Sequence, residues 1–520
     1  MAAMRTPATL RAGTDHDAVV VGAGHNGLVT AAYLARAGLR TLLLEARSAV
    51  GGTAASEPFA GATVNICSCD HTTFRTTPVM DDLDLAGHGL RYIDMEPAQV
   101  GTAWSSGPAW RHWRDVDRTI AELAATHPGE VEGFRRYLKV ARPAVELILA
   151  AANEPPSIGG LTRLALRRRL AGAPTMLRWS RRSAADVMRS FFTHDAVLGP
   201  GLVAGPMVWG VSPEQPGTGL GALTYAMRHV AQVGRPVGGS GALTGALLAA
   251  FEHHGGKLLA DSEVDGVLCD GERVIAVTLT DGTEITTSIV VSACDPHRTF
   301  VRWLRHPPAG AAGPIERWRH AEAAEGYESK IDAVLDREPR LRDSDIGLSS
   351  TWTIAPTVAE MDRAATSLLA SGSVLERPAL LVNVPTLADP TMAPAGRHVF
   401  SLEVLLTPYR RPGGWAGSPE PRRWLELFAE RCEPGFLESI VDWRAMTPDV
   451  YEREFHLPAG HAASFGGGPL AALRSRDPEL TRYETTIPGL YLTGAATFPG
   501  AGIWGASGRN CATVVLGRVA

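Results

Sequence analysis

A glycine-rich turn near the N-terminus constrains the fold more than any other feature of the chain. The apolar run Ala18–Val21 predicts a buried parallel strand, and Gly22, Gly24 and Gly27 follow it at the spacing G-x-G-x-x-G. Gly22 allows a tight turn, Gly24 allows backbone amides to approach a diphosphate, and Gly27 allows the next helix to pack closely on the strand. The segment therefore predicts a strand–turn–helix unit of the Rossmann type.

An acidic residue completes this unit. A second predicted strand, Thr41–Leu44, ends directly before Glu45, about 20 residues past the glycines, where a carboxylate would bind the ribose hydroxyls of a dinucleotide. The helix N-terminus would direct its free N–H groups at the phosphates. Because an acid here favours a free 2′-hydroxyl, FAD or NAD is expected rather than NADP. A purely structural glycine turn is the alternative.

Two further glycine-rich segments point to a family. The run 45–53 resembles the E-x-x-x-x-x-G-G extension of the flavin amine oxidase and phytoene desaturase superfamily. The segment 488–516 resembles the strand, G-A turn, P-G-x-G loop and final helix that close over the flavin in phytoene-desaturase-like proteins. The runs G-A-G-H-N-G, S-A-C-D-P and G-A-S-G-R-N make the pattern most similar to the pyridine nucleotide-disulfide oxidoreductase domain 2-like branch of these FAD-dependent oxidoreductases.

The resemblance implies FAD as the cofactor and implies the residues of the cofactor site. Non-covalent binding is expected, because no cysteine or histidine lies at a recognisable flavin-linking position. Only one complete strand–glycine–helix–acid unit occurs in the chain, so a tightly bound nicotinamide is not expected. The residues expected to contact FAD are Gly22, Gly24, Asn26, Gly27, Glu45, Ala46, Arg47, Gly51, Gly52, Thr53, Val264, Gly494, Ala495, Gly502 and Ile503.

The matched blocks lie far apart in the sequence, so the cofactor domain has to be discontinuous. The expected fold class is α/β, with a Rossmann-like FAD-binding domain and an inserted α+β substrate domain. The FAD-binding domain is expected at 15–108, 236–300 and 482–520, the substrate domain at 109–235 and 301–481, and a disordered lead at 1–14.

Local patterns predict the elements of these pieces. Two D-G turns, at 270–271 and 281–282, predict a β-meander that ends on a strand at 289–293. The first inserted piece is expected to be mainly helical. The second is expected to mix strands at 379–384 and 398–406 with helices such as 422–431.

Composition excludes several classes of protein. A net charge of −5 gives no reason to expect nucleic-acid binding, and no apolar stretch reaches the ~18 residues that a membrane span requires. The six cysteines are few and scattered, and one C-x-C pair does not make a metal site, so neither a disulfide framework nor a metal is expected. We expect a cytoplasmic protein and leave open whether it also associates with a membrane surface.

Two short segments are candidates for catalysis. The run 65–74 follows the G-G element and contains Asp70 and His71, whose side chain titrates near physiological pH. His461, with Ser464, lies in a loop that resembles a G-x-x-x-H-G loop near the active site of related enzymes. Either histidine could instead hydrogen-bond the backbone or cap a turn. Glu403 and Tyr225 are weaker candidates, and the chemistry of this superfamily does not always need a side-chain base.

Four functions remain open at this stage. The first is dehydrogenation of a C–C bond in a largely apolar small molecule, with hydride transfer to flavin N5 and reoxidation by oxygen or a quinone. The second is oxidation of an amine or imine C–N bond. The minor alternatives are a flavin-dependent isomerase and a non-catalytic prenyl-binding escort similar to the GDP-dissociation inhibitors. The substrate itself cannot be inferred.

A basic amphipathic segment raises the question of a surface partner. Seven arginines and no acid occur between 163 and 182, interleaved with leucines, and Pro174 is expected to break the run into two short helices. Ser183 resembles an N-cap of the next helix. The region 161–192 is either a solvated helical lid or a peripheral contact with an anionic membrane or a carrier.

Overall fold

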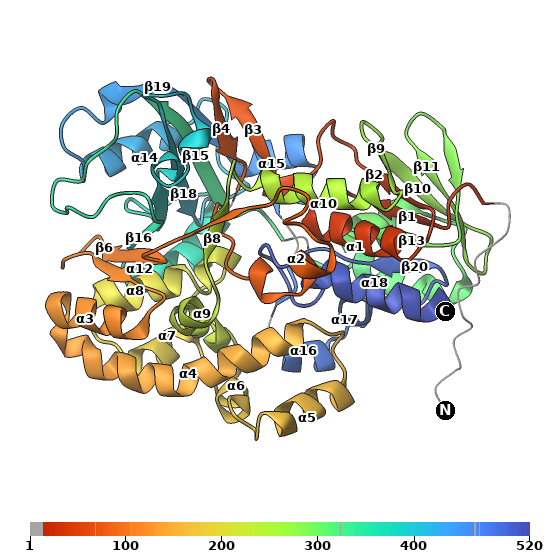
Figure 1. The fold of residues 1–520 in the computed structure, drawn as a ribbon, viewed down its shortest axis with the longest axis horizontal. Helices are drawn as coiled ribbons and strands as arrows, with labels where there is room; N and C mark the ends of the chain where they lie inside the picture. Colours follow the sequence, from red (N-terminus) through yellow and green to blue (C-terminus); the bar gives the residue numbers. More distant parts are fainter. Residues whose placement is uncertain are drawn as a thin grey trace.

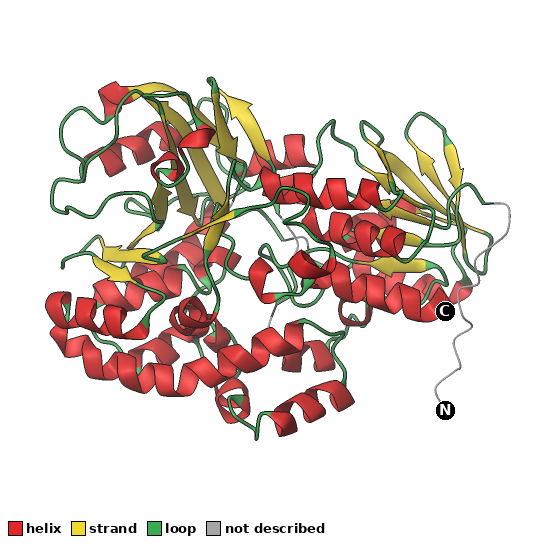
Figure 2. Cartoon of the chain, viewed as in Figure 1, coloured by secondary structure: helices red, strands yellow, loops and turns green. Residues whose placement is uncertain are grey.

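The computed structural model describes residues 14–67, 69–105, 107–322, 324–461, 464–466 and 468–519 (Figure 1). Apart from Thr14, the predicted lead at 1–14 lies outside these residues. Two sheet-based units and a helical layer make up the fold (Figure 2).

The first unit is built on a parallel sheet to which three segments of the chain contribute strands. Its strand order is β20 (Leu490–Leu492), β13 (Val290–Ser292), β1 (Ala18–Val21), β2 (Thr41–Leu44) and β9 (Lys257–Leu259). The helices α1 (His25–Arg36), α10 (Gly241–His253) and α18 (Ala506–Val519) pack on one face. This arrangement confirms the predicted Rossmann-like class, with both N-terminal strands at their predicted bounds.

A four-stranded sheet covers the other face of the parallel sheet. Its order is β12 (Glu284–Thr286), β11 (Val274–Leu279), β10 (Val264–Cys269) and β14 (Leu304–Arg305). Val19 and Val21 of β1 point into this layer, whereas Ala18 and Val20 point at the helices, as the two-residue period of a strand requires. Gly271 and Gly282 take positive φ at the two predicted turns, so the meander is as predicted.

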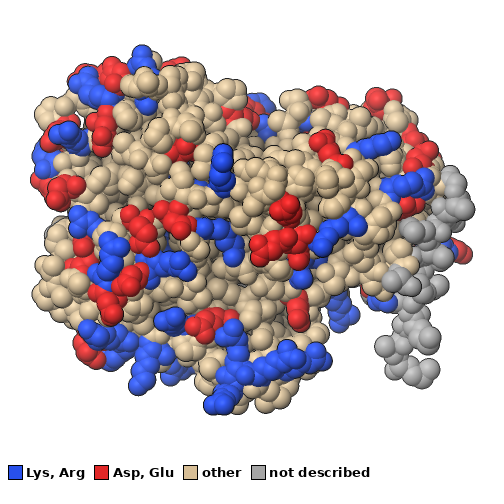
Figure 3. All heavy atoms as spheres, in the orientation of Figure 1, with Lys and Arg blue, Asp and Glu red and all other residues tan. Residues whose placement is uncertain are grey.

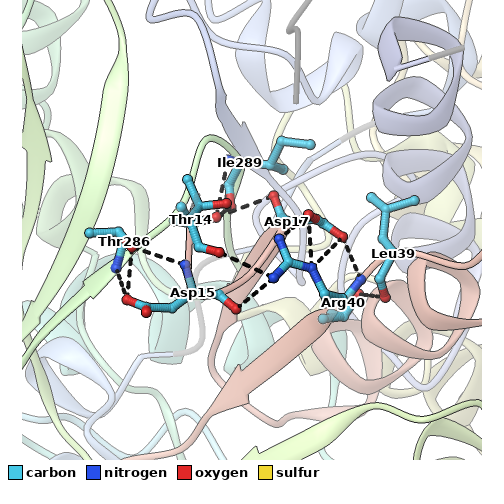
Figure 4. A network of polar contacts seen from close by, with 9 residues as sticks. Thr14, Asp15, Asp17, Leu39, Arg40, Thr286 and Ile289 are labelled. Carbon is cyan, nitrogen blue, oxygen red and sulfur yellow. Dashed lines mark hydrogen bonds and ion pairs between the residues drawn. The ribbon is translucent and has the colours of Figure 1, made fainter. Parts of the chain in front are cut away.

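Polar contacts fix the N-terminal edge of the first unit (Figure 4). The Arg40 guanidinium pairs with the Asp17 carboxylate at 2.7 Å, which joins the start of β1 to the loop before β2. The Asp15 carboxylate accepts from the Thr286 amide at 3.0 Å, which joins the same segment to β12. The residues just before β1 are thus tied to both sheets of the unit.

The second unit is built on a seven-stranded sheet. Its order is β19 (Ile440–Met446), β15 (Glu328–Leu335), β18 (His398–Leu405), β17 (Leu380–Asn383), β16 (Trp352–Ala355), β6 (Gln99–Ala103) and β7 (Trp110–His112). The helix α14 (Glu420–Ala429) packs its apolar side on one face of this sheet. The predicted strands and helix of the second inserted piece are all present, with bounds shifted by one or two residues.

A helical layer lies below the second sheet in Figure 1. Its core is aromatic, with Phe134, Tyr137, Trp179, Phe192 and Tyr225 in mutual contact. The first inserted piece is therefore mainly helical, as predicted. Its helices are α3 (Val116–Thr126), α4 (Val131–Ala152), α5 (Ile158–Arg167), α6 (Ala173–Trp179), α7 (Ala184–Arg189), α8 (Asp195–Val203) and α9 (Thr224–Val230).

Shorter elements connect these layers. They are the hairpin β3 (Ser56–Phe59) and β4 (Ala62–Asn65), the pair β5 (Tyr92–Asp94) and β8 (Gly234–Pro236), and the helices α2 (Val79–Asp82), α11 (Ala312–Arg319), α12 (Val358–Arg363), α13 (Leu369–Ser371), α15 (Pro448–Phe455), α16 (Pro469–Arg474) and α17 (Glu479–Arg482).

Two of the predicted segment boundaries need correction. The sequence predicts a first cofactor segment that runs to 108, but β6 pairs in parallel with β16 and so belongs to the seven-stranded sheet. It predicts a second segment that ends at 300, but Trp303, Ile315 and Trp318 pack on the meander side of the parallel sheet. Neither boundary can be placed from the neighbouring sequence, because distant segments determine which strands pair and which side chains pack together.

The basic segment folds into two short helices, but Pro174 does not separate them. It lies in the first turn of α6, where a proline is tolerated because the N–H it lacks would have no partner. The break comes earlier, at Arg169, Leu170 and Gly172, which all take positive φ. Ser183 caps α7 by accepting from the Asp186 amide at 3.0 Å, as predicted.

The described part of the chain offers neither a membrane span nor a metal cluster. None of its helices is both long and apolar enough to cross a bilayer. Within the same residues, no three His, Cys, Asp or Glu side chains are grouped so that they could hold a metal ion. All six cysteines are free.

Candidate functional site

The glycine turn has the close packing that its sequence predicts. Gly22 takes a φ of +98°, and a Cβ on it would lie 3.0 Å from the Cys294 sulfur. A Cβ on Gly27 would lie 2.0 Å from the Gly22 carbonyl oxygen. No side chain fits at that distance, so both glycines are needed to bring α1 against β1.

Gly24 differs from its two neighbours because it faces open space. It is the N-cap of α1 with an extended backbone, and a Cβ on it would meet nothing within 4 Å. The free N–H groups at the start of this 12-residue helix border the same space. A diphosphate fits there on both steric and electrostatic grounds.

Glu45 lies beside this turn and is held in place by it. Its carboxylate accepts from the Ala23 amide at 2.8 Å and from the Arg47 amide at 3.0 Å. The Gly51 amide donates to the Ala23 carbonyl at 2.8 Å, which brings the G-G element against the turn. The Ser262 amide donates to the Glu45 carbonyl at 2.8 Å, so the start of β10, with Val264, lies along the same edge. Segments 22–27, 45–53 and 261–264 thus converge as the resemblance implied.

Arg47 supplies a test of whether a polar cofactor fits this site. One of its terminal nitrogens pairs with Glu57 at 2.5 Å, and its guanidinium carbon lies 4.1 Å from the centre of the Phe455 ring. Its other terminal nitrogen, Nη1, is buried and has no hydrogen-bond partner among the described residues. A buried donor without an acceptor is costly, so this nitrogen fits a site that is completed by a dinucleotide.

The C-terminal segment closes over the same region. The Gly508 amide donates to the Asn26 side chain at 3.3 Å, and a Cβ on Gly508 would lie 2.4 Å from the Asn26 carbonyl oxygen. Asn26 therefore locks α18 against α1. The Gly494 amide donates to the Ser507 hydroxyl at 3.1 Å, and the Ile503 carbonyl accepts from Thr73 at 3.0 Å. These contacts place the G-A turn and the 502–503 loop beside the N-terminal unit.

His71 is enclosed, and both of its ring nitrogens already have partners. Nδ1 lies 2.8 Å from the Tyr92 hydroxyl and Nε2 lies 3.1 Å from the Ser240 hydroxyl. The side chain is fully buried, and burial lowers the pKa of His71 to about 3. The neighbouring Asp70 pairs with Arg235 at 2.6 Å. The catalytic role of His71 stays a prediction that this geometry does not favour.

The state of His71 leads to a prediction about stability at low pH. Its pKa is lower in the folded protein than the usual 6.5, so stability is present above pH 6.5 and is lost as the pH falls towards 3. At pH 5 this loss amounts to about 2 kcal/mol. We expect His71→Gln to lose less stability than the wild type between pH 7 and pH 5, as measured by urea unfolding. An equal loss in both proteins would contradict this role.

Ser464 and Phe465, which follow His461, contact the segment predicted to close over the flavin. The Phe465 amide donates to the Ala495 carbonyl at 2.8 Å, and the Ala501 amide donates to the Ser464 hydroxyl at 3.1 Å. The loop therefore rests on the predicted flavin-closing turn. The His461 ring packs on Tyr327 with 5.8 Å between centroids, and burial lowers the pKa of His461. Its catalytic role also stays a prediction.

Of the weaker candidates, Tyr225 and Glu403 have different surroundings. Tyr225 belongs to the aromatic core of the helical layer, and its hydroxyl donates to the Val197 carbonyl. Glu403 lies on β18 in a polar group that also contains Cys67, Glu328 and Lys330. Glu328 is a residue that the sequence motifs do not single out. The alternation of Glu328, Lys330 and Asp332 with the uncharged residues Ser329, Ile331 and Ala333 in one strand was the available signal.

Comparison with known proteins extends the match to the whole chain. A family description, NAD(P)-binding Rossmann-like domain, matches residues 20–83. The pyridine nucleotide-disulfide oxidoreductase domain-containing protein 2 of Rattus norvegicus is 28% identical, over 96% of this chain and 93% of the rat protein. The lycopene-forming phytoene desaturase of a Paracoccus species is 26% identical, over 95% and 96%.

Over nearly its whole length the chain is similar to phytoene desaturases. Among solved structures, a variant of putrescine oxidase is similar with a TM-score of 0.63, at 17% identity and with 97% and 99% of the two chains covered. At this identity the likeness concerns the fold. The predicted family, the α/β class, an FAD-dependent oxidoreductase activity and FAD as cofactor are all confirmed.

Proposed function

We propose that the protein dehydrogenates a C–C bond of a largely apolar small molecule. The observation that carries this proposal is the full-length similarity to proteins named for such reactions, namely phytoene desaturases and, at 26% identity over 96% of this chain, a limonene dehydrogenase component of Castellaniella defragrans. When bound, the flavin supplies the hydride acceptor at N5. Oxygen or a quinone would then take the electrons.

The roles of the two units follow from this proposal. The first unit binds FAD through the fifteen residues predicted from the sequence, and the inserted unit forms the wall that the substrate meets. Three observations support this division: the open space at Gly24, the unpaired Arg47 nitrogen, and the contacts of Ser464 and Phe465 with the 494–503 segment.

Oxidation of a C–N bond is the second candidate. The specific observation in its favour is the pair of partly buried carboxyl groups Glu328 and Glu403, because carboxylates attract a substrate ammonium. Isomerisation and prenyl escort remain minor alternatives. The chain is 25% identical to prolycopene isomerase 1 of an Oncidium hybrid and resembles a Rab GDI of Plasmodium falciparum with a TM-score of 0.52. The unpaired Arg47 nitrogen speaks against an escort without cofactor.

A substrate panel under anaerobic conditions separates these functions. We expect flavin bleaching with an apolar alkene, phytoene or limonene in detergent, and none with putrescine or cyclohexylamine. NADH and NADPH should bleach the flavin slowly, because the chain has one dinucleotide-binding unit. Stopped-flow absorbance measures the bleaching rate with each compound. Rapid bleaching by an amine would establish the second candidate, and rapid stoichiometric bleaching by NADH alone would contradict the proposed electron source.

An anionic membrane is the proposed surface partner. The surface of α5 and α6 combines exposed cations with exposed apolar side chains, and α5 buries none of its residues. Figure 3 shows Lys and Arg gathered along the lower edge of the molecule, where Figure 1 places α5 and α6. We call it the basic surface; it consists of Arg163, Arg167, Arg169, Arg178 and Arg181 with Ile158, Leu166, Leu170 and Leu177.

A further inference from the structure

One face of the seven-stranded sheet carries an unusual row of charged side chains. Glu328, Lys330 and Asp332 alternate along β15, so they share a face. Glu403 of β18 is directly opposite Lys330 and therefore lies on the same face. Figure 1 shows β15 and β18 beside the β3–β4 hairpin, and the segment that follows this hairpin meets the row.

The segment 65–67 contacts this row through two hydrogen bonds. The Lys330 ammonium donates to the Asn65 carbonyl at 2.6 Å, and the Cys67 thiol donates to the Glu328 carboxylate at 3.5 Å. This segment belongs to the run 65–74 that the sequence singled out for chemistry. Cys67 is the side chain of this run that contacts the row, whereas Asp70 pairs with Arg235 and Thr351 and His71 lies between Tyr92 and Ser240.

The charges along this face do not balance. Ion pairs link Arg47, Glu57, Arg444, Asp332 and Lys330 into an alternating chain of three cations and two anions. Glu328 and Glu403 add two carboxylates. The full group then holds four anions against three cations, so one negative charge is in excess in the interior. A buried excess charge is costly, and one bound proton would remove it.

Glu403 is the unpaired member of the group. Among the described residues, no side chain or backbone group hydrogen-bonds its carboxylate. Glu403, Glu328 and Cys67 all lie deep in the protein, yet each keeps part of its surface accessible. The pair is therefore not fully sealed from solvent.

We propose that Glu328 and Glu403 share one proton near neutral pH and form the proton-accepting site of the inserted unit. Dehydrogenation transfers a hydride from one atom of the substrate to the flavin, which would be bound in the first unit, and releases a proton from the neighbouring atom. The electron pair that held this proton becomes the second bond of the new double bond. The proton passes to the free carboxylate of the pair. This accepting step rests on the proposed oxidation and is the same for a C–C and a C–N bond.

The electrostatics of the surrounding groups support a shared proton. Burial, and then the charge of Glu328, raise the pKa of Glu403 to about 8, and Lys330 opposes this in part. Burial likewise raises the pKa of Glu328, against the Cys67 hydrogen bond. The thiol of Cys67 and the hydroxyls of Tyr327 and Tyr451 face the pair with raised pKa values and stay neutral. Of the other charged groups, Arg444 pairs with Asp332 and so compensates its charge. Burial lowers the pKa of His461.

Infrared titration of the FAD-loaded protein tests the shared proton without a substrate. Between pH 6 and pH 9 ordinary carboxyl groups are ionised, so a protonated-carboxyl C=O band in this range reports a raised pKa. We expect one such band in the wild type, titrating close to pH 8, and its loss in Glu403→Gln and in Glu328→Gln. Absence of the band from the wild type, or its persistence in both variants, would overturn the proposal.

Glu479→Gln is the matched control. Glu479 is also a buried carboxylate, but it pairs with Arg317 and accepts from the Trp318 indole at 2.8 Å, so its charge is already compensated. The infrared band should survive this change. Thermal melting provides a second measurement if a variant is unstable. The raised pKa means that stability is lost as the pH rises towards 8, and Glu403→Gln should flatten this loss while Glu479→Gln should not.

The accepting role is tested with the panel compound that bleaches the flavin fastest. The double change Glu328→Gln with Glu403→Gln removes both acceptor carboxylates, so it should slow bleaching about 100-fold and leave the concentration for half-saturation unchanged. Bleaching at the wild-type rate would overturn the accepting role. If no compound bleaches the flavin, the proposed function fails, and the infrared result still decides whether the pair shares a proton.

Discussion

A protein in which Gly24 is replaced by valine should fold normally and be colourless. The backbone of Gly24 is extended, with φ −65° and ψ 165°, which valine adopts readily, and its Cβ would meet no protein atom within 4 Å. The valine side chain would instead occupy the space in front of α1 that the diphosphate requires. We expect FAD affinity to fall by more than about 100-fold, or roughly 2.7 kcal/mol. FAD absorbance after gel filtration measures the loss, and circular dichroism and thermal melting report the fold.

Two other glycines make this experiment specific. A Cβ on Gly245 of α10 also meets nothing within 4 Å, so Gly245→Val should remain yellow. Gly27→Val should fail to fold, because its Cβ would lie 2.0 Å from the Gly22 carbonyl oxygen. If Gly24→Val retained wild-type FAD content, the space in front of α1 would not be the diphosphate site.

The glycine turn and the strands β1 and β2 could be predicted because the local sequence determines them. The bounds of β1 and β2 follow from four-residue apolar runs, and the turn between β1 and α1 follows from glycines whose positions sterics dictates. The convergence of 22–27, 45–53 and 494–503 came from the family resemblance, since no local pattern states which distant segments meet. The structure brings them together through contacts such as the hydrogen bond from Gly51 to Ala23 and, just after 494–503, the hydrogen bond from Gly508 to Asn26.

The polar face of the inserted unit was not predictable in the same way. Glu328 and Glu403 are 75 positions apart in the sequence, and only the pairing of β15 with β18 places them on one face. His71 shows the converse. A histidine beside an aspartate looked suited to catalysis, but Tyr92 and Ser240, which occupy both of its ring nitrogens, come from distant segments. The sequence thus identifies titratable residues near a motif, but it does not identify the residues that hydrogen-bond them.

Reversal of three charges on the basic surface should abolish binding to anionic vesicles. Arg163, Arg167 and Arg169 are exposed, and no described acid pairs with them, whereas Arg168 pairs with Glu146 at 3.3 Å. The triple change to Glu should therefore leave the fold intact. Each arginine near an anionic surface contributes about 1 kcal/mol, so loss of three cations alone weakens binding by about 3 kcal/mol, which is more than 100-fold.

Co-sedimentation with vesicles of mixed phosphatidylserine and phosphatidylcholine measures this binding. It should require the anionic lipid and weaken as salt is added, because screening acts within about 10 Å at 0.1 M salt. The exposed apolar side chains Ile158 and Leu166, which are 74% and 64% exposed, should add a contribution that salt does not remove. Their joint replacement by Ser separates the two contributions, since it should lower binding at high salt more than at low salt. If the wild type stays in the supernatant with anionic vesicles at low salt, α5 and α6 form a solvated lid instead.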